Sequence, residues 1–146
     1  MNSPKKLFSE KDKETLIQAI REAEKRSSAE IRIHIENHCS GAVLDRATAV
    51  FHKLEMHKTE LRNGVLIYLA LKDRQTAIIG DQGINAMVSR DFWLNCYDSM
   101  AKHFAEGDFV GGIVSAIENF QDDLGKLFPH QPDDVNELSD EISFGN

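Results

Sequence analysis

The chain has 146 residues, of which 41% are hydrophobic and 28% are charged, and its formal net charge is -7. This length favours one globular domain. The acidic balance argues against a protein that binds nucleic acid, because contacts to the phosphate backbone need clustered Lys and Arg. No apolar run approaches the roughly 20 residues of a membrane helix, and residues 1–10 lack the apolar core of a signal peptide. A cytoplasmic protein is therefore expected.

The first two predicted elements are a helix and a strand. Ser9 and Asp12 form a variant of the capping box, and the apolar residues that follow recur at helical spacing, which predicts an amphipathic helix ending near residues 27–28. Residues 29–36 alternate between apolar and polar side chains. This period of two is typical of a strand that is covered on one face.

The middle of the chain contains a second helix and a hairpin. Asp45 is expected to cap the second helix, which carries apolar residues on one face. Residues 65–71 are apolar without alternation, which predicts a central strand buried on both faces. A polar loop of ordinary length follows, and residues 76–79 form the returning strand.

Two more helices precede a tail of different composition. Asp91 is the expected cap of the third helix, and the fourth begins at Phe109 and stops before Pro129. Residues 129–146 contain several acidic residues and no Lys or Arg. We therefore expect a domain over residues 1–128, followed by an acidic tail that is loosely ordered or laid along the surface.

The order of these elements predicts which residues meet at one end of the sheet. A helix connects the first strand to the second, which favours a parallel pair with a right-handed crossover. A short loop connects the second strand to the third, so those two are antiparallel. The start of the first strand, the start of the second and the end of the third therefore share one edge of a small mixed sheet. The loop of residues 106–108 is expected to reach the same edge.

The side chains at this edge suggest a cation site. Carboxylate, amide and backbone carbonyl oxygens are the ligands that Ca²⁺ and Mg²⁺ prefer in proteins, and the glycines in the turn of residues 80–83 leave room for carbonyl groups to approach a ligand. The predicted metal ligands are Glu30, Asn63, Asp81 and Asp108. The alternative is purely structural: Asp81 caps the following turn or helix, Glu30 pairs with Arg62, and no ligand is bound.

Other chemical motifs are missing from the sequence. The six histidines show no HExxH or HxH spacing, so a zinc site is not indicated. There is no P-loop, dinucleotide-binding glycine motif or nucleophile elbow. Cys39 and Cys96 form no CxxC pattern and are expected to be reduced thiols. No catalytic residue is predicted.

Two blocks of the sequence resemble a known family. Residues 62–67 read Arg-Asn-Gly-Val-Leu-Ile, and residues 78–85 read Ile-Ile-Gly-Asp-Gln-Gly-Ile-Asn. They look like the two hallmark blocks of the TPM domain, a widespread domain long catalogued as of unknown function. The resemblance spans roughly residues 8–128, and the tail looks like that of short bacterial members. One departure is Arg62, where most members carry Asp before the Asn-Gly pair.

The resemblance implies a fold and a range of activities. The fold is an α/β/α sandwich with a small mixed sheet, in which a central hairpin is flanked by about four helices. Family members bind calcium or similar divalent cations. Some are thylakoid-lumen or membrane-associated proteins linked to photosystem II repair, one animal member modulates a receptor channel, and acid phosphatase activity has been claimed for a plant member.

Three functional hypotheses follow. The first is a non-catalytic interaction or assembly domain that binds Ca²⁺ or Mg²⁺ at the Glu30 and Asp81 end. The second is a metal-assisted acid phosphatase, in which the metal polarises a phosphoryl oxygen of a phosphomonoester and Arg62 stabilises the developing charge. The third is a structural protein without a metal, whose acidic tail binds a basic surface on another protein.

Overall fold

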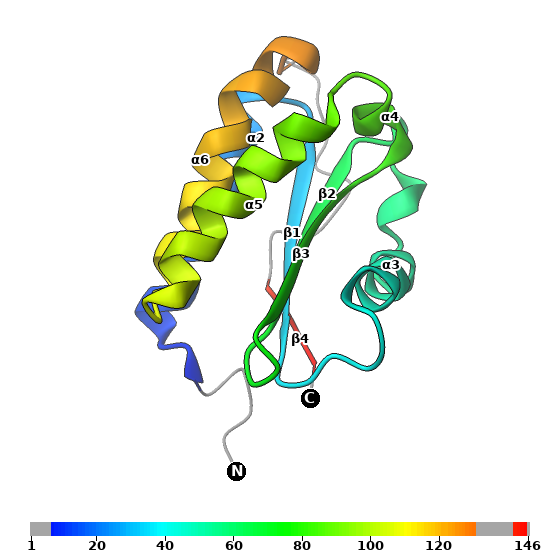
Figure 1. Cartoon of the computed structure of the whole chain (residues 1–146). Helices are drawn as coiled ribbons and strands as arrows, with labels where there is room; N and C mark the ends of the chain where they lie inside the picture. The colour runs from blue at the N-terminus through cyan, green and yellow to red at the C-terminus, as the bar shows by residue number, and fades with distance from the viewer. Residues whose placement is uncertain (1–6, 131–141, 146) are drawn as a thin grey trace.

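The computed structural model describes residues 7–130 and 142–145. Its centre is a four-stranded mixed sheet with the strand order β3-β2-β1-β4 (Figure 1). The described strands are β1 (Glu30–Glu36), β2 (Gly64–Ala70), β3 (Gln75–Gly80) and β4 (Ser143–Phe144). β1 and β2 are parallel and β2 and β3 are antiparallel, so the predicted mixed topology is confirmed.

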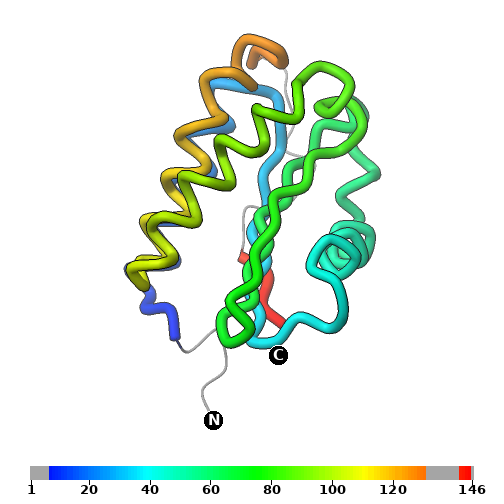
Figure 2. The backbone as a smooth tube through the Cα atoms, in the orientation of Figure 1, coloured from blue at the N-terminus to red at the C-terminus, as the bar shows by residue number. Residues whose placement is uncertain are grey.

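Helices cover both faces of the sheet, which confirms the predicted α/β/α sandwich. Three long helices lie on one face and one helix lies on the other, an arrangement that can be followed in Figures 1 and 2. The three are α2 (Glu10–Arg26), α5 (Arg90–Ala105) and α6 (Phe109–Leu127), and α3 (Val43–Lys53) covers the opposite face. Two single turns complete the described helices: the 3-10 turn η1 (Met56–Lys58) and α4 (Gln82–Asn85).

The helix caps confirm some predicted boundaries and correct others. In the capping box of α2, the Ser9 Oγ accepts the Asp12 N–H at 3.0 Å, and the Asp12 carboxylate accepts the Ser9 N–H at 3.2 Å. α3 begins at Val43, so Asp45 lies in its first turn and is not its cap. Ser89 is the N-cap residue of α5, so Asp91 lies in the first turn of this helix and is not its cap. Capping residues therefore locate a helix better than they locate its first residue.

Two separate cores explain why β2 is continuously apolar. The isoleucines of β1 and alternate residues of β2 pack against α2, α5 and α6, where Phe120 is fully buried. On the other face, Tyr68 and its β2 neighbours pack against α3 and Met56. Every residue of β2 is buried, as the sequence predicts for a central strand.

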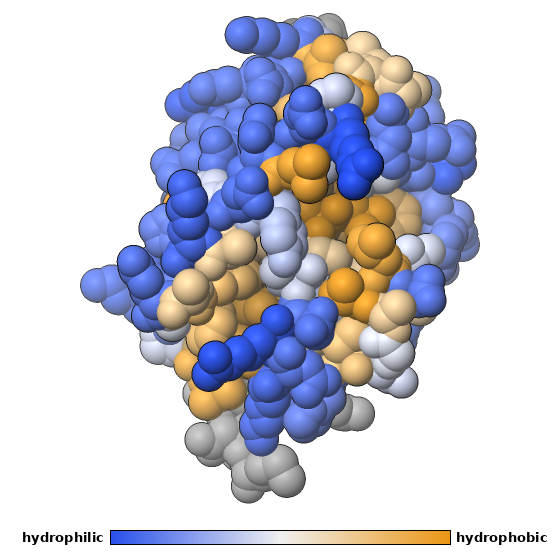
Figure 3. Space-filling model, viewed as in Figure 1, coloured by the Kyte–Doolittle hydropathy of each residue, from blue (hydrophilic) through white to orange (hydrophobic). Residues whose placement is uncertain are grey.

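The surface around β3 is less completely covered. Figure 3 shows apolar side chains gathered in the middle of the face that Figure 1 presents, where β3 lies between α5 and α3. Three of the large exposed apolar residues of the described chain are Leu61, Met87 and Leu94. Within the described part of the chain, no helix has the length and apolar composition needed to cross a lipid bilayer.

The predicted tail contributes to the sheet. Ser143 and Phe144 pair in parallel with His34 and Ile35 and form β4. The prediction of a loosely ordered or surface-laid tail did not anticipate a strand here, and for residues 131–141 it lies outside the described residues. The last described residues therefore belong to the same folded unit as residues 7–130.

Candidate functional site

Three of the four predicted ligands, Glu30, Asn63 and Asp81, meet at one end of the sheet. The Glu30 N–H donates to the Asn63 carbonyl at 3.2 Å, and the Asp81 N–H donates to the Gly64 carbonyl at 2.9 Å. All three polar residues are buried, with exposed fractions of 6% for Glu30, 2% for Asn63 and 7% for Asp81. The strand topology deduced from the sequence places these residues correctly.

Arg62 is the partner of Asp81 at this end. Its Nε and Nη2 atoms donate to the two carboxylate oxygens of Asp81 at 2.8 and 2.9 Å. The Asp81 Oδ1 also accepts the Gln82 N–H at 2.8 Å and so caps α4. The hydrogen bond to Asp81 raises the pKa of Arg62. The structural alternative is thus correct about the cap, but it named Glu30 as the partner of Arg62, where the structure has Asp81.

These contacts do not form a ready-made cation site. Both oxygens of Asp81 are engaged by the Arg62 guanidinium, and the Asn63 amide nitrogen donates to the Ser28 carbonyl at 2.9 Å. Among residues 7–130 and 142–145, no three or more His, Cys, Asp or Glu side chains are grouped so as to hold a metal ion. A Ca²⁺ or Mg²⁺ ion would have to compete with Arg62 for Asp81.

Asp108 lies at the opposite end of the sheet, so the expectation that its loop reaches the Asp81 end is wrong. The far end of α6 is tied to the start of β1, because the Ser28 N–H donates to the Phe128 carbonyl at 2.7 Å. The near end of α6 lies by the β2–β3 loop, where Asp108 and Lys72 line one pocket. Asp108 caps α6 by accepting the Gly111 N–H at 2.9 Å.

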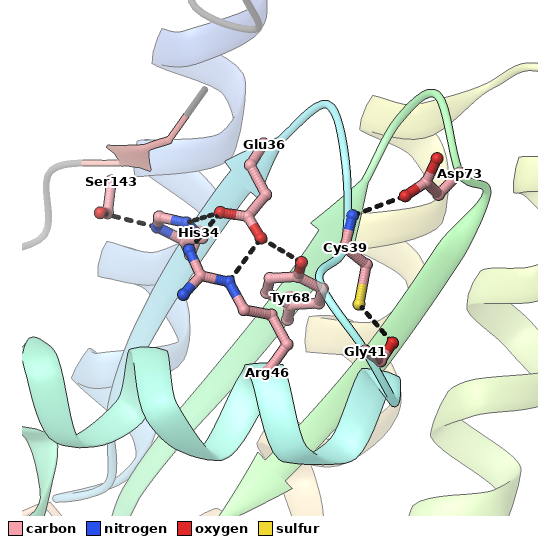
Figure 4. Close-up of polar contacts among 8 residues, drawn as sticks. All are labelled: His34, Glu36, Cys39, Gly41, Arg46, Tyr68, Asp73 and Ser143. Carbon is pink, nitrogen blue, oxygen red and sulfur yellow. Dashed lines mark hydrogen bonds and ion pairs between the residues drawn. The ribbon is translucent and has the colours of Figure 1, made fainter.

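A second polar group is buried under the opposite half of β1 (Figure 4). We call it the Glu36 cluster, and its members come from β1, α3, β2 and β4. The Glu36 carboxylate accepts from the Arg46 Nε and Nη2 at 2.8 and 2.7 Å and from the Tyr68 hydroxyl. His34 lies 3.0 Å from Glu36 through Nε2, and 2.8 Å from the Ser143 hydroxyl through Nδ1.

The contacts within the Glu36 cluster determine which of its members are charged. Burial opposes ionisation of Glu36, but the hydrogen bonds from Arg46, Tyr68 and His34 outweigh it and lower the pKa of Glu36 to about 2. Burial lowers the pKa of His34, so the ring is neutral at physiological pH. A neutral ring that donates a hydrogen bond from Nε2 to the carboxylate accepts a hydrogen bond from the Ser143 hydroxyl at Nδ1.

A pocket of about 690 Å³ opens beside the Glu36 cluster, between α3 and β4. Its polar lining includes His34, Arg46, Lys53 and Ser143. The pocket contains hydrogen-bond donors and acceptors, and charged side chains of both signs. Such a lining suits a polar ligand more than an apolar one. The histidine spacing in the sequence gives His34 no role, whereas the structure shows it buried and hydrogen-bonded. The sequence signal that could have indicated a buried polar group is Glu36, a second polar residue on the same face of the strand as His34.

The loop after β1 forms the rim beside this pocket. The Asp73 carboxylate accepts the Cys39 N–H at 2.7 Å and contacts the His38 Nδ1 at 3.0 Å. The hydrogen bonds from His38 and from the Cys39 backbone lower the pKa of Asp73. Figure 4 shows the hydrogen bond between Cys39 and Asp73 next to the Glu36 cluster. Both cysteines are free thiols, as expected.

Acidification is expected to lower the free energy of unfolding in two pH ranges. The folded-state pKa of His34 is lower than its ordinary value of 6.5, so the unfolded chain binds the proton more readily and stability falls as the pH drops below that value. The pKa of Glu36 is lowered from 4.5 to about 2, so its contribution to the free energy of unfolding is lost as the pH falls between these two values. Urea unfolding across this range measures both. A His34→Gln variant that keeps the upper decline would contradict the assignment to His34.

Comparisons with known proteins identify the family and the fold. The family profile of the TPM domain matches residues 1–123. The BA42 protein of the psychrophilic bacterium Bizionia argentinensis, solved by NMR, is 43% identical with a TM-score of 0.89, over 94% of this chain and 95% of that one. Comparison with curated proteins finds no match.

Two more distant structures share the fold. The N-terminal domain of a P. gingivalis protein is 21% identical with a TM-score of 0.68, over 85% of this chain and 80% of that one. The N-terminal domain of cg2496 from Corynebacterium glutamicum is 13% identical with a TM-score of 0.63, over 95% of this chain and 80% of that one. At these identities the likeness concerns the fold alone. The profile match over most of the chain, together with the two sequence blocks around Asn63 and Asp81, shows that this chain belongs to the TPM domain family.

Proposed function

We propose that this chain is a non-catalytic interaction domain that binds Ca²⁺ or Mg²⁺ at the sheet end containing Asp81. The observation that supports it is the convergence of Glu30, Asn63 and Asp81 from three separate segments. Carboxylate and amide oxygens are suited to hard cations. The cation and Arg62 compete for Asp81, because the guanidinium already engages both carboxylate oxygens.

This competition is possible because Arg62 is near the surface. Its side chain is 38% exposed, whereas that of Asp81 is 6% exposed. The guanidinium can therefore turn into solvent while Asp81 stays fixed as the cap of α4. An ion pair with one solvent-exposed partner contributes little to stability, so its loss on cation binding costs little.

Removing the charge of Arg62 is expected to strengthen cation binding. An Arg62→Gln variant leaves Asp81 without its competing cation, and we expect a dissociation constant for Ca²⁺ or Mg²⁺ about tenfold lower, a change worth about 1.4 kcal/mol. The measurement is a titration of each salt followed by backbone amide chemical shifts of residues 80–83. An Asp81→Asn variant is expected to lose the response.

Asp108→Asn provides the matched control, since Asp108 is the same residue type at the other end of the sheet. It should leave the titration unchanged. Amide shifts at residues 80–83 that stay constant in both the natural chain and the Arg62→Gln variant would overturn the proposal.

The remaining hypotheses stay predictions. A metal-assisted phosphatase would use the same carboxylate end, and turnover of an aryl phosphate that disappears in Asp81→Asn would be its evidence. A structural role through the acidic tail requires a partner that is lost when the tail of residues 129–146 is changed. The cytoplasmic location expected from the sequence is likewise a prediction.

A further inference from the structure

We call the edge of β1 that pairs with β4, together with the side chains around it, the seat of β4. This seat fits a specific tripeptide. The chain places Ser143, Phe144 and Gly145 along the edge of β1 that faces away from β2, in parallel register with His34 and Ile35. The Gly145 N–H extends the pairing by donating to the Ile35 carbonyl at 2.8 Å. Pairing of this kind is how an extended peptide adds to a sheet edge, with backbone bonds giving affinity and side-chain pockets giving specificity.

The first two residues of the tripeptide are read on opposite faces of the sheet. The Ser143 hydroxyl meets the His34 Nδ1 at 2.8 Å on the face of the Glu36 cluster. On the other face, the Phe144 ring lies 6.5 Å from the Phe8 ring, and the Lys13 ammonium lies 5.8 Å from its centroid. The seat therefore favours a small hydroxyl residue followed by an aromatic one.

The third residue must be glycine. A Cβ atom at position 145 would lie 2.6 Å from the Glu36 Oε1 and 3.1 Å from the His34 Nε2. Glu36 cannot turn aside easily, because Arg46 and Tyr68 hold its carboxylate. A larger residue would have to break the Glu36 cluster or leave the edge of β1.

We propose that the edge of β1 is a recognition site for an extended segment with the order Ser-Phe-Gly on another protein, and that the chain's own Ser143–Gly145 is a built-in competitor for it. Four members of the Glu36 cluster come from β1, α3 and β2, so the seat remains formed when the tail leaves. β4 is only two residues long, against about 5–6 in an ordinary strand, so exchanging it costs little. The inference is independent of the cation proposal, because it concerns His34 and Glu36 rather than the Asp81 end.

The competition sets the expected affinities. A tethered segment has a high effective concentration at its own seat, so a free peptide should bind the natural chain weakly. A full-length Gly145→Val variant cannot seat its own tail and should bind the peptide at least tenfold more tightly. The probe is the synthetic peptide Glu-Ile-Ser-Phe-Gly-Asn, which copies the end of the chain. A second variant carrying Ser143→Ala and Phe144→Ala releases the tail by a different change.

The experiment is a peptide titration followed by NMR, with preserved amide dispersion showing that each variant is folded. The expected result is saturable shifts at His34, Ile35 and Tyr68 in both released variants. Ser89→Ala removes an exposed hydroxyl that forms no side-chain cap hydrogen bond to α5, so this variant should behave like the natural chain. No binding to either released variant, or equal binding of a peptide with Val in place of Gly, overturns the proposal. A concentration-dependent dimer of the natural chain that Gly145→Val abolishes would make the occupant a second copy and overturn the assignment to another protein.

Discussion

Replacing Glu36 by Gln is expected to lower the free energy of unfolding by about 3–5 kcal/mol, the range measured when one partner of a buried ion pair is removed. The Glu36 side chain is 3% exposed and accepts two hydrogen bonds from Arg46. Gln keeps the shape of the side chain but has no negative charge. The Arg46 guanidinium and the Tyr68 hydroxyl then lose a charged acceptor inside the protein. Urea unfolding of the purified variant at neutral pH measures the change.

Glu22→Gln is the control for this substitution. Glu22 also forms an ion pair, with Lys25 at 3.2 Å, but its side chain is 49% exposed. Exposed pairs on helices contribute about 0.3–0.5 kcal/mol, so this variant should unfold almost as the natural chain does. If Glu36→Gln cost no more than Glu22→Gln, the Glu36 cluster would not stabilise the fold, and the fixed carboxylate needed for the Ser-Phe-Gly seat would be lost with it.

The sequence was most informative where one periodic pattern governs a whole element. The alternation in residues 29–36 and the apolar run in residues 65–71 each predict a strand, and both strands form. The prediction that β1 is covered on one face only is wrong, because six of its seven residues are buried and it pairs with both β2 and β4. Connection lengths then determine the strand directions, which brings Glu30 and Asp81 to one end of the sheet. These features depend on local pattern and on general rules of chain connection.

The misplacement of Asp108 has a different origin. β3 ends at the Asp81 end, and α5 then runs back along the sheet for 16 residues, or about 24 Å at 1.5 Å per residue. Its far end, with the loop before α6, must therefore lie near the hairpin loop. The direction of α5 is implicit in the order of elements, and the length of this helix places residues 106–108 at the end opposite to the predicted one.

The Glu36 cluster could be predicted only in part. His34 and Glu36 share the polar face of a strand, and buried polar residues require partners. Their partners Arg46 and Ser143 come from a helix and from the tail, and no local pattern links these positions. β4 itself is two residues long, too short for a periodic signal. Short strands formed by distant segments are determined by tertiary contacts alone.

The turn glycines have a structural cause that the sequence alone does not show. In the sequence, the glycines of residues 80–83 suggest a turn that leaves room for carbonyl groups to approach a ligand. In the structure, a Cβ at Gly80 would lie 2.3 Å from the Trp93 ring, and one at Gly83 would lie 2.2 Å from the Leu61 carbonyl oxygen. The absence of a side chain is therefore required by neighbours within the protein.

Gly83→Ala is accordingly expected to lower the free energy of unfolding by about 3 kcal/mol, at the upper end of the cost of inserting a methyl group into a packed site. The added Cβ would lie 2.2 and 2.6 Å from the Leu61 and Arg62 carbonyl oxygens. These are backbone atoms that cannot rotate away. The Gly83 N–H also donates to the Arg62 carbonyl at 2.9 Å, so relief of the clash would move Arg62 away from Asp81.

Urea unfolding measures the loss, and the amide shifts of residues 80–83 report whether the Asp81 end has moved. Gln82→Ala is the matched control, because Gln82 is the exposed neighbour in the same turn and Ala shortens a side chain there without adding an atom near the backbone. A Gly83→Ala variant as stable as Gln82→Ala would show that the backbone of residues 61–62 moves away from the added methyl group at no cost in free energy. The Arg62–Asp81 pair would then be too loosely held to control access of a cation to Asp81, so the stability of this one variant also bears on the cation proposal.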